Sequence, residues 1–173
     1  MNYAAIKKTD VANGPGIRVS LFVSGCTHAC KGCFNSEAWD FTYGQPFTRE
    51  TEKEILKALD NEYITGFSVL GGEPMEPQNR GTVLGLLRQV REAYPGKSIW
   101  CYTGYEYEKD LLRWSADGDG IVTELLDLID VLVDGVFVEE KKDLRLAFRG
   151  SANQRLIDVK ASKKAGYAVC CPI

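Results

Sequence analysis

The sequence has little excess of charge in either direction, with 21 basic residues against 24 acidic ones and a net charge of -3. General nucleic-acid binders carry a clear excess of basic residues, so we expect no nucleic acid as a partner. The chain also lacks a run of 18 apolar residues, which excludes a membrane-spanning helix of the usual kind. Residues 1–8 lack the apolar core of a signal peptide. Together these absences predict a cytosolic (cytoplasmic) protein whose partners are neither nucleic acid nor membrane.

Long linkers, internal repeats and low-complexity tracts are also missing from the 173 residues. A chain of this length can bury the core of one compact domain. We therefore expect a single domain over residues 1–173. Within it, residues 158–173 form a tail to which the sequence assigns no role.

Histidine is nearly absent, since His28 is the only one, and one short loop holds half of the cysteines. Cys26, Cys30 and Cys33 follow one another closely, and no fourth cysteine lies nearby. In a reducing cytosol such cysteines are more often metal ligands or catalytic groups than disulfide partners. A 4Fe-4S cluster normally takes four cysteine ligands. Three ligands would leave one iron open to a small molecule, which makes this loop a candidate catalytic site.

The same spacing also suits a structural zinc site, which takes its fourth ligand from another cysteine or a histidine. His28 would have to supply that ligand, and a tetrahedral site closed within one loop would be cramped. The other cysteines are expected to be bystanders, with Cys101 in an apolar strand and Cys170 and Cys171 as free thiols. The residues alone leave both an iron–sulfur site and a zinc module open.

Apolar periodicity predicts strands that alternate with helices along most of the chain. The expected strands cover residues 17–23, 67–70, 98–102 and 131–138, and the expected helices cover residues 48–61, 82–93, 106–114 and 122–129. Such alternation is typical of an α/β fold with a mainly parallel sheet and right-handed crossovers. These units are too few to close an eight-stranded barrel. We therefore expect an open, partial (β/α) barrel.

Several polar or glycine-rich segments follow or end the expected strands. They are the cysteine loop, Gly71-Gly72, Thr103-Gly104 and Asp134-Gly135. In α/β sheets ligands bind at the carboxyl ends of strands, so we expect these segments to converge on one edge. A Gly-Gly pair on its own would mark only a turn.

The cysteine loop after the first of these strands, followed by Gly71-Gly72-Glu73-Pro74 after the second, resembles the radical S-adenosylmethionine (SAM) enzymes. Upstream, residues 13–18 (Asn-Gly-Pro-Gly-Ile-Arg) resemble the Gly-Pro-Gly-x-Arg segment of glycyl-radical activating enzymes. Further segments narrow the resemblance, over residues 1–157, to the family that activates anaerobic ribonucleoside-triphosphate reductases. They are Gly25–Asn35, Gly44–Phe47, Pro77–Asn79, Trp100–Tyr105, Val133–Gly135 and Arg149–Arg155.

The resemblance implies one 4Fe-4S cluster held by Cys26, Cys30 and Cys33, with S-adenosyl-L-methionine chelated to the open iron. Reductive cleavage of SAM would yield methionine and a 5′-deoxyadenosyl radical, which is chemistry of the cofactor. The radical would take a hydrogen atom from a glycine near the C-terminus of the catalytic subunit of the reductase. A flavodoxin-type protein is the electron donor that the resemblance suggests. The chain would thus be a radical SAM oxidoreductase that generates a glycyl radical on its partner.

The resemblance also implies positions that bind SAM. Gly71, Gly72 and Glu73 would lie at the methionyl amino group. Glycines let the backbone approach a ligand closely, and Glu73 would be a structural or ammonium-pairing group. Thr103 and Asp134 lie at expected strand ends, so their position predicts either polar contacts to SAM or, for the aspartate, a turn or cap.

The adenine contact departs from the family pattern. Many radical SAM enzymes place an aromatic residue just before the third cysteine, and this chain has Gly32 there. Either Phe34, directly after Cys33, takes that role or the adenine rests on the backbone of Gly32. His28 would tune the cluster by a hydrogen bond or simply occupy the loop. The polar segment Arg149–Arg155 would contact SAM, dock the glycine loop of the partner, or form a solvated loop.

Two other classes of function remain open. Another radical SAM enzyme, such as a formate-lyase-type activase or one that modifies a small molecule or peptide, would share the cysteine loop, although such enzymes usually need more chain to enclose a substrate. A non-enzymatic metal module would explain the cysteines but would give no reason for Gly71-Gly72-Glu73-Pro74. In the tail, Lys160–Lys164 is expected to be a solvated surface.

Overall fold

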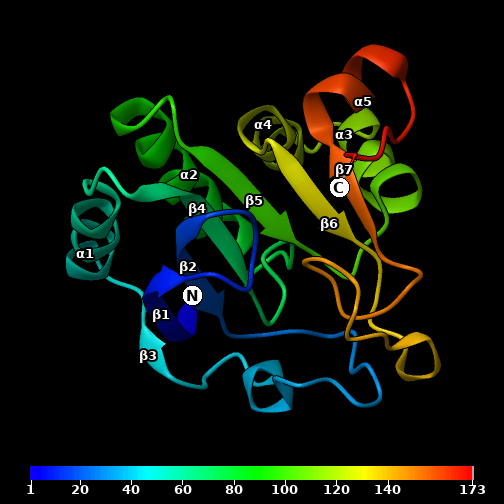
Figure 1. The fold of residues 1–173 in the computed structure, drawn as a ribbon, viewed down its shortest axis with the longest axis horizontal. Helices are drawn as coiled ribbons and strands as arrows, with labels where there is room; N and C mark the ends of the chain where they lie inside the picture. Colours follow the sequence, from blue (N-terminus) through cyan, green and yellow to red (C-terminus); the bar gives the residue numbers. More distant parts are fainter. Residues whose placement is uncertain (173) are drawn as a thin grey trace.

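The computed structural model describes residues 1–172 and contains a seven-stranded sheet (Figure 1). The strands are β1 (Asn2–Asp10), β2 (Ile17–Val23), β3 (Gln45–Pro46), β4 (Ile64–Gly71), β5 (Ser98–Tyr102), β6 (Val131–Asp134) and β7 (Arg155–Asp158). Their order across the sheet is β3-β1-β2-β4-β5-β6-β7. Neighbours from β2 to β6 pair in parallel, whereas β1, β3 and β7 pair antiparallel. The fold is therefore a mixed α/β fold whose open sheet is parallel in the middle.

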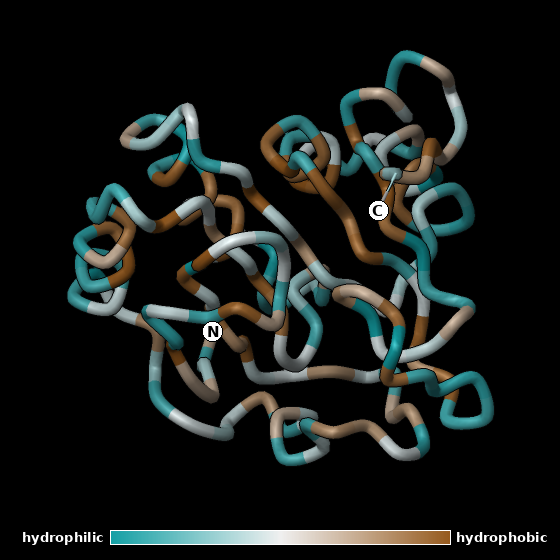
Figure 2. Tube along the Cα trace, in the orientation of Figure 1, coloured by the Kyte–Doolittle hydropathy of each residue, from teal (hydrophilic) through white to brown (hydrophobic). Residues whose placement is uncertain are grey.

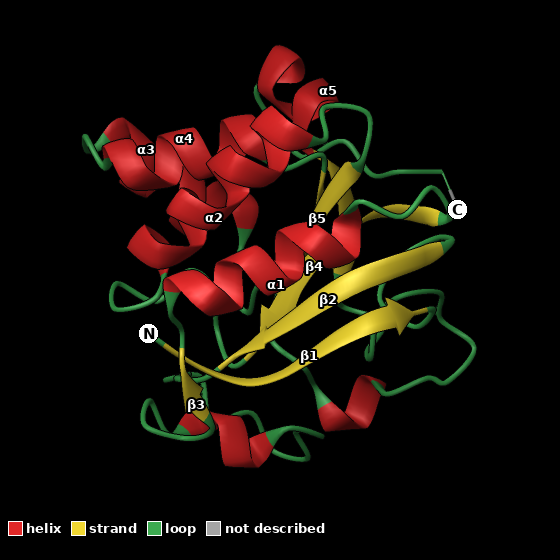
Figure 3. Ribbon diagram, turned by 90° about the vertical axis from the view of Figure 1, so that its left-hand side faces the viewer, coloured by secondary structure: helices red, strands yellow, loops and turns green. Residues whose placement is uncertain are grey.

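Helices connect the parallel strands and gather on one face of the sheet. The α-helices are α1 (Arg49–Leu59), α2 (Arg80–Ala93), α3 (Arg113–Ala116), α4 (Gly120–Leu128) and α5 (Val159–Ala165). Figure 3 shows α1, α2 and α4 lying together beside the strands. Short 3-10 turns occur at Ser36–Trp39 and Glu139–Lys141, and a π-helical turn at Tyr107–Leu112 leads directly into α3. Of the helices in residues 1–172, none combines the length and the apolar character that crossing a membrane requires.

Alternation along β2 decides which side chains reach the helices. Val19, Leu21 and Val23 are fully buried in the main core, which fills the space between the sheet and α1, α2 and α4. Figure 2 shows hydrophobic residues along β5, β6 and α4, the elements that enclose this core. Because successive side chains of a strand point to opposite faces, Arg18 and Ser20 lie on the other face of the sheet. The apolar and polar sides of β2 are thus fixed by the period of two in its sequence.

Arg18 is a fully buried cation at the amino end of β2. Its guanidinium donates to the hydroxyls of Ser68 (2.7 Å) and Ser98 (2.9 Å) and to the carbonyls of Phe67 and Ser98 (2.8 and 2.9 Å), and it lies 5.4 Å from the ring of Trp100. Burial lowers the pKa of Arg18 to about 10. One side chain therefore ties β2, β4 and β5 together through neutral oxygens.

The Gly-Pro-Gly turn before β2 leaves room for that arginine. Gly14 adopts φ +127, and a Cβ there would lie 2.8 Å from Cδ of Arg18. A non-glycine residue would meet both a backbone penalty and the arginine side chain. The turn and the buried arginine are thus one structural unit.

Most of the expected elements are confirmed. The strands expected at residues 17–23 and 98–102 have those bounds, and the helices expected at 48–61 and 82–93 appear as α1 and α2. Thr48 caps α1, where its side chain accepts a hydrogen bond from the Thr51 amide in a capping box. The strand expected to run to residue 138 instead ends at Asp134, because Gly135 adopts φ +93 and turns the chain.

The tail is more ordered than its sequence indicated. β7 and α5 follow the last expected element, and Asp158 caps α5 by accepting from the Ala161 amide (2.8 Å). Residues 168–171 then run along β7, with the Asp158 amide donating to the Val169 carbonyl (2.9 Å) and the Cys171 amide to the Leu156 carbonyl (2.8 Å). This segment covers the edge of β7. The lysines of α5 at 160, 163 and 164 are exposed, as expected.

Candidate functional site

A hollow of about 120 Å³ opens at the carboxyl ends of the parallel strands, and we call it the cysteine pocket. Its walls come from the cysteine loop and from the segments that follow β4, β5 and β6, so the expected convergence of strand ends is seen. The lining residues are Cys26, His28, Cys30, Cys33, Phe34, Trp39, residues 70–73, 102–104 and 135–137, and Gln154.

The three clustered cysteines are free thiols, each half-buried in the wall of the cysteine pocket. Ala29 has a left-handed backbone (φ +48), and the Cys33 amide donates to the Cys30 carbonyl (3.1 Å), so the loop folds back on itself. Burial raises the pKa of the Cys26 thiol to about 11 and also raises the pKa of Cys30. Burial thus disfavours the thiolate forms of Cys26 and Cys30, and bound metal ions would stabilise them.

Two residues to which the sequence reasoning assigned no role, Glu76 and Asn79, anchor the cysteine loop. The amide and the hydroxyl of Thr27 both donate to Oε1 of Glu76 (2.8 and 2.5 Å). The side-chain amide of Asn79 donates to the carbonyls of Ser24 and Glu73 (both 2.9 Å). Glu76 and Asn79 are both buried. The sequence pattern that could have indicated both residues is a polar side chain at every third position after the glycine pair, at 73, 76 and 79.

The glycine pair is required by the protein's own backbone. Gly71 adopts φ +112, and a Cβ there would lie 2.6 Å from the Val23 amide nitrogen. A Cβ on Gly72 would lie 2.5 Å from the carbonyl oxygen of Gly25. The Gly72 amide donates to the Val23 carbonyl (2.7 Å), so β2 and β4 deliver their loops side by side. Both glycines are explained without any ligand, and their contact with SAM stays a prediction.

Glu73 has a carboxylate that is 1% exposed and surrounded by donors. Oε1 accepts from the Met75 amide and the Thr103 hydroxyl (both 2.8 Å), and Oε2 accepts from the Gly104 amide (2.7 Å). His28 Nε2 lies 3.0 Å from Oε2, and this hydrogen bond raises the pKa of His28. Glu73 therefore joins the cysteine loop to the end of β5, which is a structural role, and the hydroxyl of Thr103 is committed to it.

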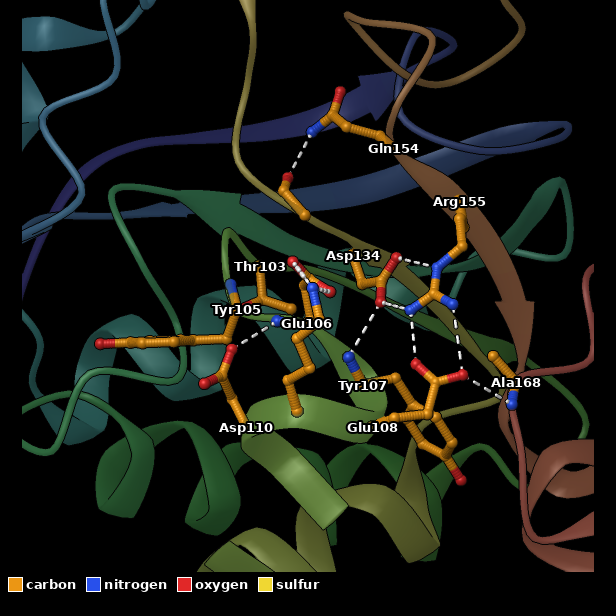
Figure 4. Close-up of polar contacts among 12 residues, drawn as sticks. Thr103, Tyr105, Glu106, Tyr107, Glu108, Asp110, Asp134, Gln154, Arg155 and Ala168 are labelled. Atoms are coloured by element: carbon orange, nitrogen blue, oxygen red, sulfur yellow. Dashed lines mark hydrogen bonds and ion pairs between the residues drawn. The ribbon is translucent and has the colours of Figure 1, made fainter. Parts of the chain in front are cut away.

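Asp134 does not line the cysteine pocket, although the sequence places it beside the expected SAM contacts. Its carboxylate is 1% exposed and pairs with Arg155, whose Nε donates to Oδ1 (3.0 Å) and whose Nη2 contacts Oδ2 (Figure 4). Oδ2 also accepts from the Tyr107 amide (2.9 Å). With both oxygens engaged, the carboxylate holds the end of β6 against β7 and the π-helical turn. In this structure Asp134 positions neighbouring elements, and its contact with SAM stays a prediction.

Arg155 also binds Glu108, and this carboxylate reaches the tail. Nη2 of Arg155 donates to Oε2 of Glu108 (2.7 Å), and the Ala168 amide donates to Oε1 (3.0 Å), as Figure 4 shows. Arg155 lowers the pKa of Glu108, and Asp134 raises the pKa of Arg155. We call Asp134, Arg155 and Glu108 the clamp, and no sequence pattern indicated it because its members are far apart along the chain.

Gly32 and Phe34, the two expected adenine positions, lie at the rim. Gly32 adopts φ +73, and a Cβ there would lie 2.8 Å from a carboxylate oxygen of Glu139. Gly32 lines a neighbouring hollow instead of the cysteine pocket, whereas Phe34 lines both and is 84% exposed. The left-handed backbone of Gly32, which residues with a Cβ rarely adopt, explains why an aromatic residue is disfavoured before Cys33.

The neighbouring hollow has a volume of about 460 Å³, and we call it the side hollow. It shares Cys33, Phe34, Leu70, Tyr102, Phe137 and Gln154 with the cysteine pocket. Arg149 also lines the side hollow, and its Nε is buried without a hydrogen-bond partner. The Gln154 side chain donates to the Gly135 carbonyl (2.9 Å) and accepts from the Gly150 amide (2.9 Å). The polar segment before β7 therefore shapes the wall between the two hollows.

The donor set of the cysteine pocket suits an iron–sulfur cluster better than a zinc ion. A structural zinc ion needs four ligands converging on one point. Within residues 1–172, no group of three or more His, Cys, Asp or Glu side chains converges in that way. His28 is paired with Glu73, which leaves the three thiols as the free ligands. A cluster spreads its irons over several positions and takes thiolates as ligands, so these residues fit it.

The outlying cysteines lie away from this pocket. Cys101 is fully buried in the main core, as expected for a small apolar residue. Cys170 is exposed, and Cys171 is half-buried beside Trp100 and Leu156. None of the three lines the cysteine pocket.

Comparison with known proteins agrees with this geometry. A family model described as a 4Fe-4S single cluster domain matches residues 12–157. Proteins named anaerobic ribonucleoside-triphosphate reductase-activating protein are similar over 156 residues. The relative from Escherichia coli (strain K12) is 43% identical, with 89% of this chain and 96% of the relative covered. The one from Vibrio cholerae is 45% identical with the same coverage, and the one from enterobacteria phage T4 is 42% identical with 90% and 93% covered.

These identities extend across nearly the whole of each relative, and the matched region contains the cysteine loop, the glycine pair and the ends of β5 and β6. On both grounds, the chain belongs to the family of anaerobic ribonucleoside-triphosphate reductase-activating proteins.

Proposed function

We propose that this protein is the enzyme that activates an anaerobic ribonucleoside-triphosphate reductase, using SAM and one 4Fe-4S cluster. The observation that carries the proposal is the cysteine pocket, where three free thiols meet the ends of the parallel strands. The family membership supports the same activity. The open sheet with its parallel centre would then be the partial barrel of a radical SAM enzyme, formed by one domain.

Cys26, Cys30 and Cys33 would hold the cluster, and the backbone at Gly71 and Gly72 would receive SAM. When bound, the two cofactors supply the one-electron chemistry that removes a hydrogen atom from a glycine Cα. Glu73 would act on this site through Thr103 and the cysteine loop.

The chain's own residues hold the loop and shape access to it. The buried carboxylates of Glu73 and Glu76 fix the cysteine loop by hydrogen bonds, so its thiols stay in position. Preorganised groups of this kind need no rearrangement when the reaction begins. Phe34 and Leu144, 84% and 91% exposed, stand at the side hollow and would exclude water once a partner covers them.

The partner would be the catalytic subunit of the reductase, which offers a glycine-bearing loop near its C-terminus. The side hollow borders Cys33 and is larger than the cysteine pocket, so it has room for such a loop. A flavodoxin-type protein would supply the electron. Arg149, with a buried Nε free to donate, would bind a carbonyl of the incoming loop.

The first test is anaerobic reconstitution with iron and sulfide, followed by reduction with dithionite and addition of SAM. We expect an EPR signal of the reduced cluster that shifts when SAM binds, together with 5′-deoxyadenosine. Addition of the reductase should then produce a glycyl-radical signal. A protein that is EPR-silent and holds stoichiometric zinc would contradict the proposal.

A further inference from the structure

Two polar side chains in the wall of the side hollow have no partner within residues 1–172. Oη of Tyr102 and Nε of Arg149 are both buried and without a hydrogen-bond partner there. Buried polar groups of folded proteins are nearly always paired, so each of these atoms calls for an explanation. The proposed function gives a role to Arg149 and none to Tyr102.

Tyr102 lies at the carboxyl end of β5 and lines both the cysteine pocket and the side hollow. Burial raises the pKa of Tyr102, so its hydroxyl keeps the proton and can donate a hydrogen bond. The next residue, Thr103, is bound to Glu73 (2.8 Å), which fixes this strand end. Tyr102 therefore presents a neutral donor at the boundary between the two hollows.

The side-chain acceptors around Arg149 are already occupied. The carboxylate of Asp143 pairs with Arg145 (2.9 Å). Oε1 of Gln154 accepts from the Gly150 amide (2.9 Å) and from the amide that follows it (3.1 Å). Both acceptors line the side hollow together with Arg149. An acceptor for the Arg149 guanidinium is therefore expected from a group that enters the hollow.

Asn13, at the start of the Gly-Pro-Gly turn, adds an acceptor to the same wall. Its side-chain Nδ2 donates to Asp10 (2.6 Å), and its carbonyl accepts from the Ser68 hydroxyl (2.6 Å). These two bonds fix the residue in place. Because Nδ2 is directed to Asp10, Oδ1 is the end of the side chain that can accept from an incoming N–H.

This set of groups matches a peptide main chain. Each peptide unit offers one C=O acceptor and one N–H donor. The side hollow offers the complement of both, with donors at Tyr102 and Arg149 and an acceptor at Asn13. A carboxylate or a phosphate, which only accepts, would leave Oδ1 of Asn13 unused. Glycine in particular has no side chain, so a protein can recognise it only through its main chain.

We propose that the side hollow binds the main chain of the partner segment that carries the reacting glycine, with Tyr102 and Arg149 donating to its carbonyls and Asn13 accepting from an N–H. This inference rests on the proposed function and adds Tyr102 and Asn13 to the residues that bind the substrate protein. Because Tyr102 lines both hollows, its hydrogen bond holds the segment where the side hollow meets the cysteine pocket.

The test uses the holoenzyme with SAM and the catalytic subunit of its reductase. Tyr102→Phe removes only the hydroxyl, and Arg149→Met removes the other donor. Tyr63→Phe is the matched control, because Tyr63 is an exposed tyrosine outside both hollows. EPR follows the rate of glycyl-radical formation against the concentration of reductase. Calorimetry measures SAM affinity without reductase, and urea unfolding measures the stability of the metal-free protein.

We expect Tyr102→Phe to raise the half-saturating concentration of reductase about fivefold, the effect of one neutral hydrogen bond, and by more than it lowers the maximal rate. Arg149→Met should raise it about twentyfold, because a charged donor is lost. Tyr63→Phe should match the wild type. SAM affinity should change by less than about twofold in Tyr102→Phe. Its unfolding free energy should not fall, because the hydroxyl has no partner within residues 1–172.

An unchanged dependence on reductase in Tyr102→Phe would overturn the proposal. A matching loss of SAM affinity would also overturn it, because the hydroxyl would then bind the cofactor. A fall in unfolding free energy would do the same, because the hydroxyl would then have a partner inside the fold. Formation of 5′-deoxyadenosine and of the glycyl radical by the wild type tests the proposed function separately. Failure of main-chain binding and failure of the enzyme assignment are therefore distinguishable.

Discussion

This chain resembles its relatives in segments that lie at both ends of β2. A buried cation lies at one end, and buried carboxylates lie at the other. At the amino end, Arg18 is fully buried and donates to hydroxyl and carbonyl oxygens. At the carboxyl end, Glu73 and Glu76 are buried and accept from amides and hydroxyls of the loops around them. The charge is matched by neutral groups at both ends, with His28 as an addition beside Glu73.

The two ends of β2 differ in whether any group remains free to bind a ligand. All the contacts of Arg18 are internal and join three strands, so the amino end contributes to stability alone. The carboxylates at the other end also satisfy their partners, but they hold a loop whose three thiols remain free. The comparison separates a part of the fold that supplies stability from a part that supplies ligands, and mutations should separate the same two properties.

The largest effect should come from the free thiols. Cys26→Ala, Cys30→Ala or Cys33→Ala should each abolish SAM cleavage, because each removes a cluster ligand. The thermal unfolding midpoint of the metal-free protein should change little, since the thiols are only half-buried. Iron content, 5′-deoxyadenosine formation and calorimetric unfolding measure the three properties.

The outlying cysteines provide the control for that experiment. Cys101→Ala, Cys170→Ala and Cys171→Ala should keep most of the cleavage activity, because these residues lie outside the cysteine pocket. Loss of activity in Cys170→Ala would show that the tail takes part in the site.

At the other end of β2, Arg18→Met should lower the free energy of unfolding by about 3 kcal/mol, because buried acceptors lose their donor. The folded fraction should still take up iron. Urea unfolding followed by circular dichroism measures the change. Arg88→Met, at an exposed position, should change it by less than about 1 kcal/mol. If the two variants were equally stable, the structural role of Arg18 would be wrong.

Gly72→Ala probes the close approach of the two loops at the carboxyl end. Its Cβ would lie 2.5 Å from the Gly25 carbonyl oxygen, so the cysteine loop must move. We expect a loss of about 2 kcal/mol in unfolding free energy, typical of overpacking, together with lower iron occupancy.

Gly85→Ala is the matched control, because Gly85 lies inside α2 and a Cβ there meets nothing within 4 Å. This substitution should raise the unfolding free energy by about 1 kcal/mol, since alanine is the better helix former. Equal destabilisation by both changes would contradict the steric explanation.

The smallest expected effect is on the pH dependence of stability, through the ion pair of Arg155 with Glu108. Arg155 holds the pKa of Glu108 below its ordinary value of 4.5. A depressed folded-state pKa adds stability above the unfolded value, and this stability is lost as pH falls through the folded value. The difference in unfolding midpoint between wild type and Glu108→Gln should therefore shrink between about pH 6 and about pH 3.

The corresponding difference for Arg18→Met should change less over that range, because the hydroxyl and carbonyl partners of Arg18 do not titrate and Asp10 and Asp130 act on it only as charges without a direct contact. Midpoints from differential scanning fluorimetry at several pH values give both curves. A pH-independent gap for Glu108→Gln would mean that its ion pair adds no stability.

Patterns of apolar residues were sufficient for the centre of the sheet. β2 and β5 are short, apolar and flanked by turn residues, so their bounds could be predicted from the sequence. β1 (Asn2–Asp10) was missed because this half-exposed strand contains lysines and an aspartate among few apolar residues. β7 was missed because it spans only Arg155–Asp158, inside a polar stretch.

Some features of the site could likewise be predicted from the sequence, and others could not. The cysteines, the glycine pair and the strand-end positions could be found from motifs and from the rule that ligands meet strand ends. The partners of Glu73 could not, because Thr103 and His28 reach it only through the tertiary fold. Asp134 is the converse case, since the sequence indicated a strand-end carboxylate near the ligand but gave no indication that it binds Arg155.

The anchoring of the cysteine loop has a consequence for the order of events during synthesis. Cys26, Cys30 and Cys33 lie within the first 33 residues, next to the antiparallel pair of β1 and β2. The pairing of β1 with β2 is a local contact and can form early. The groups that shape the loop arrive later, from Glu73, Glu76 and Gly104. A ribosome-bound chain therefore exposes three thiols on an unanchored loop, and the loop reaches its native shape only after residue 104 has emerged. The three thiols therefore reach their native arrangement only once these later segments have folded onto the loop.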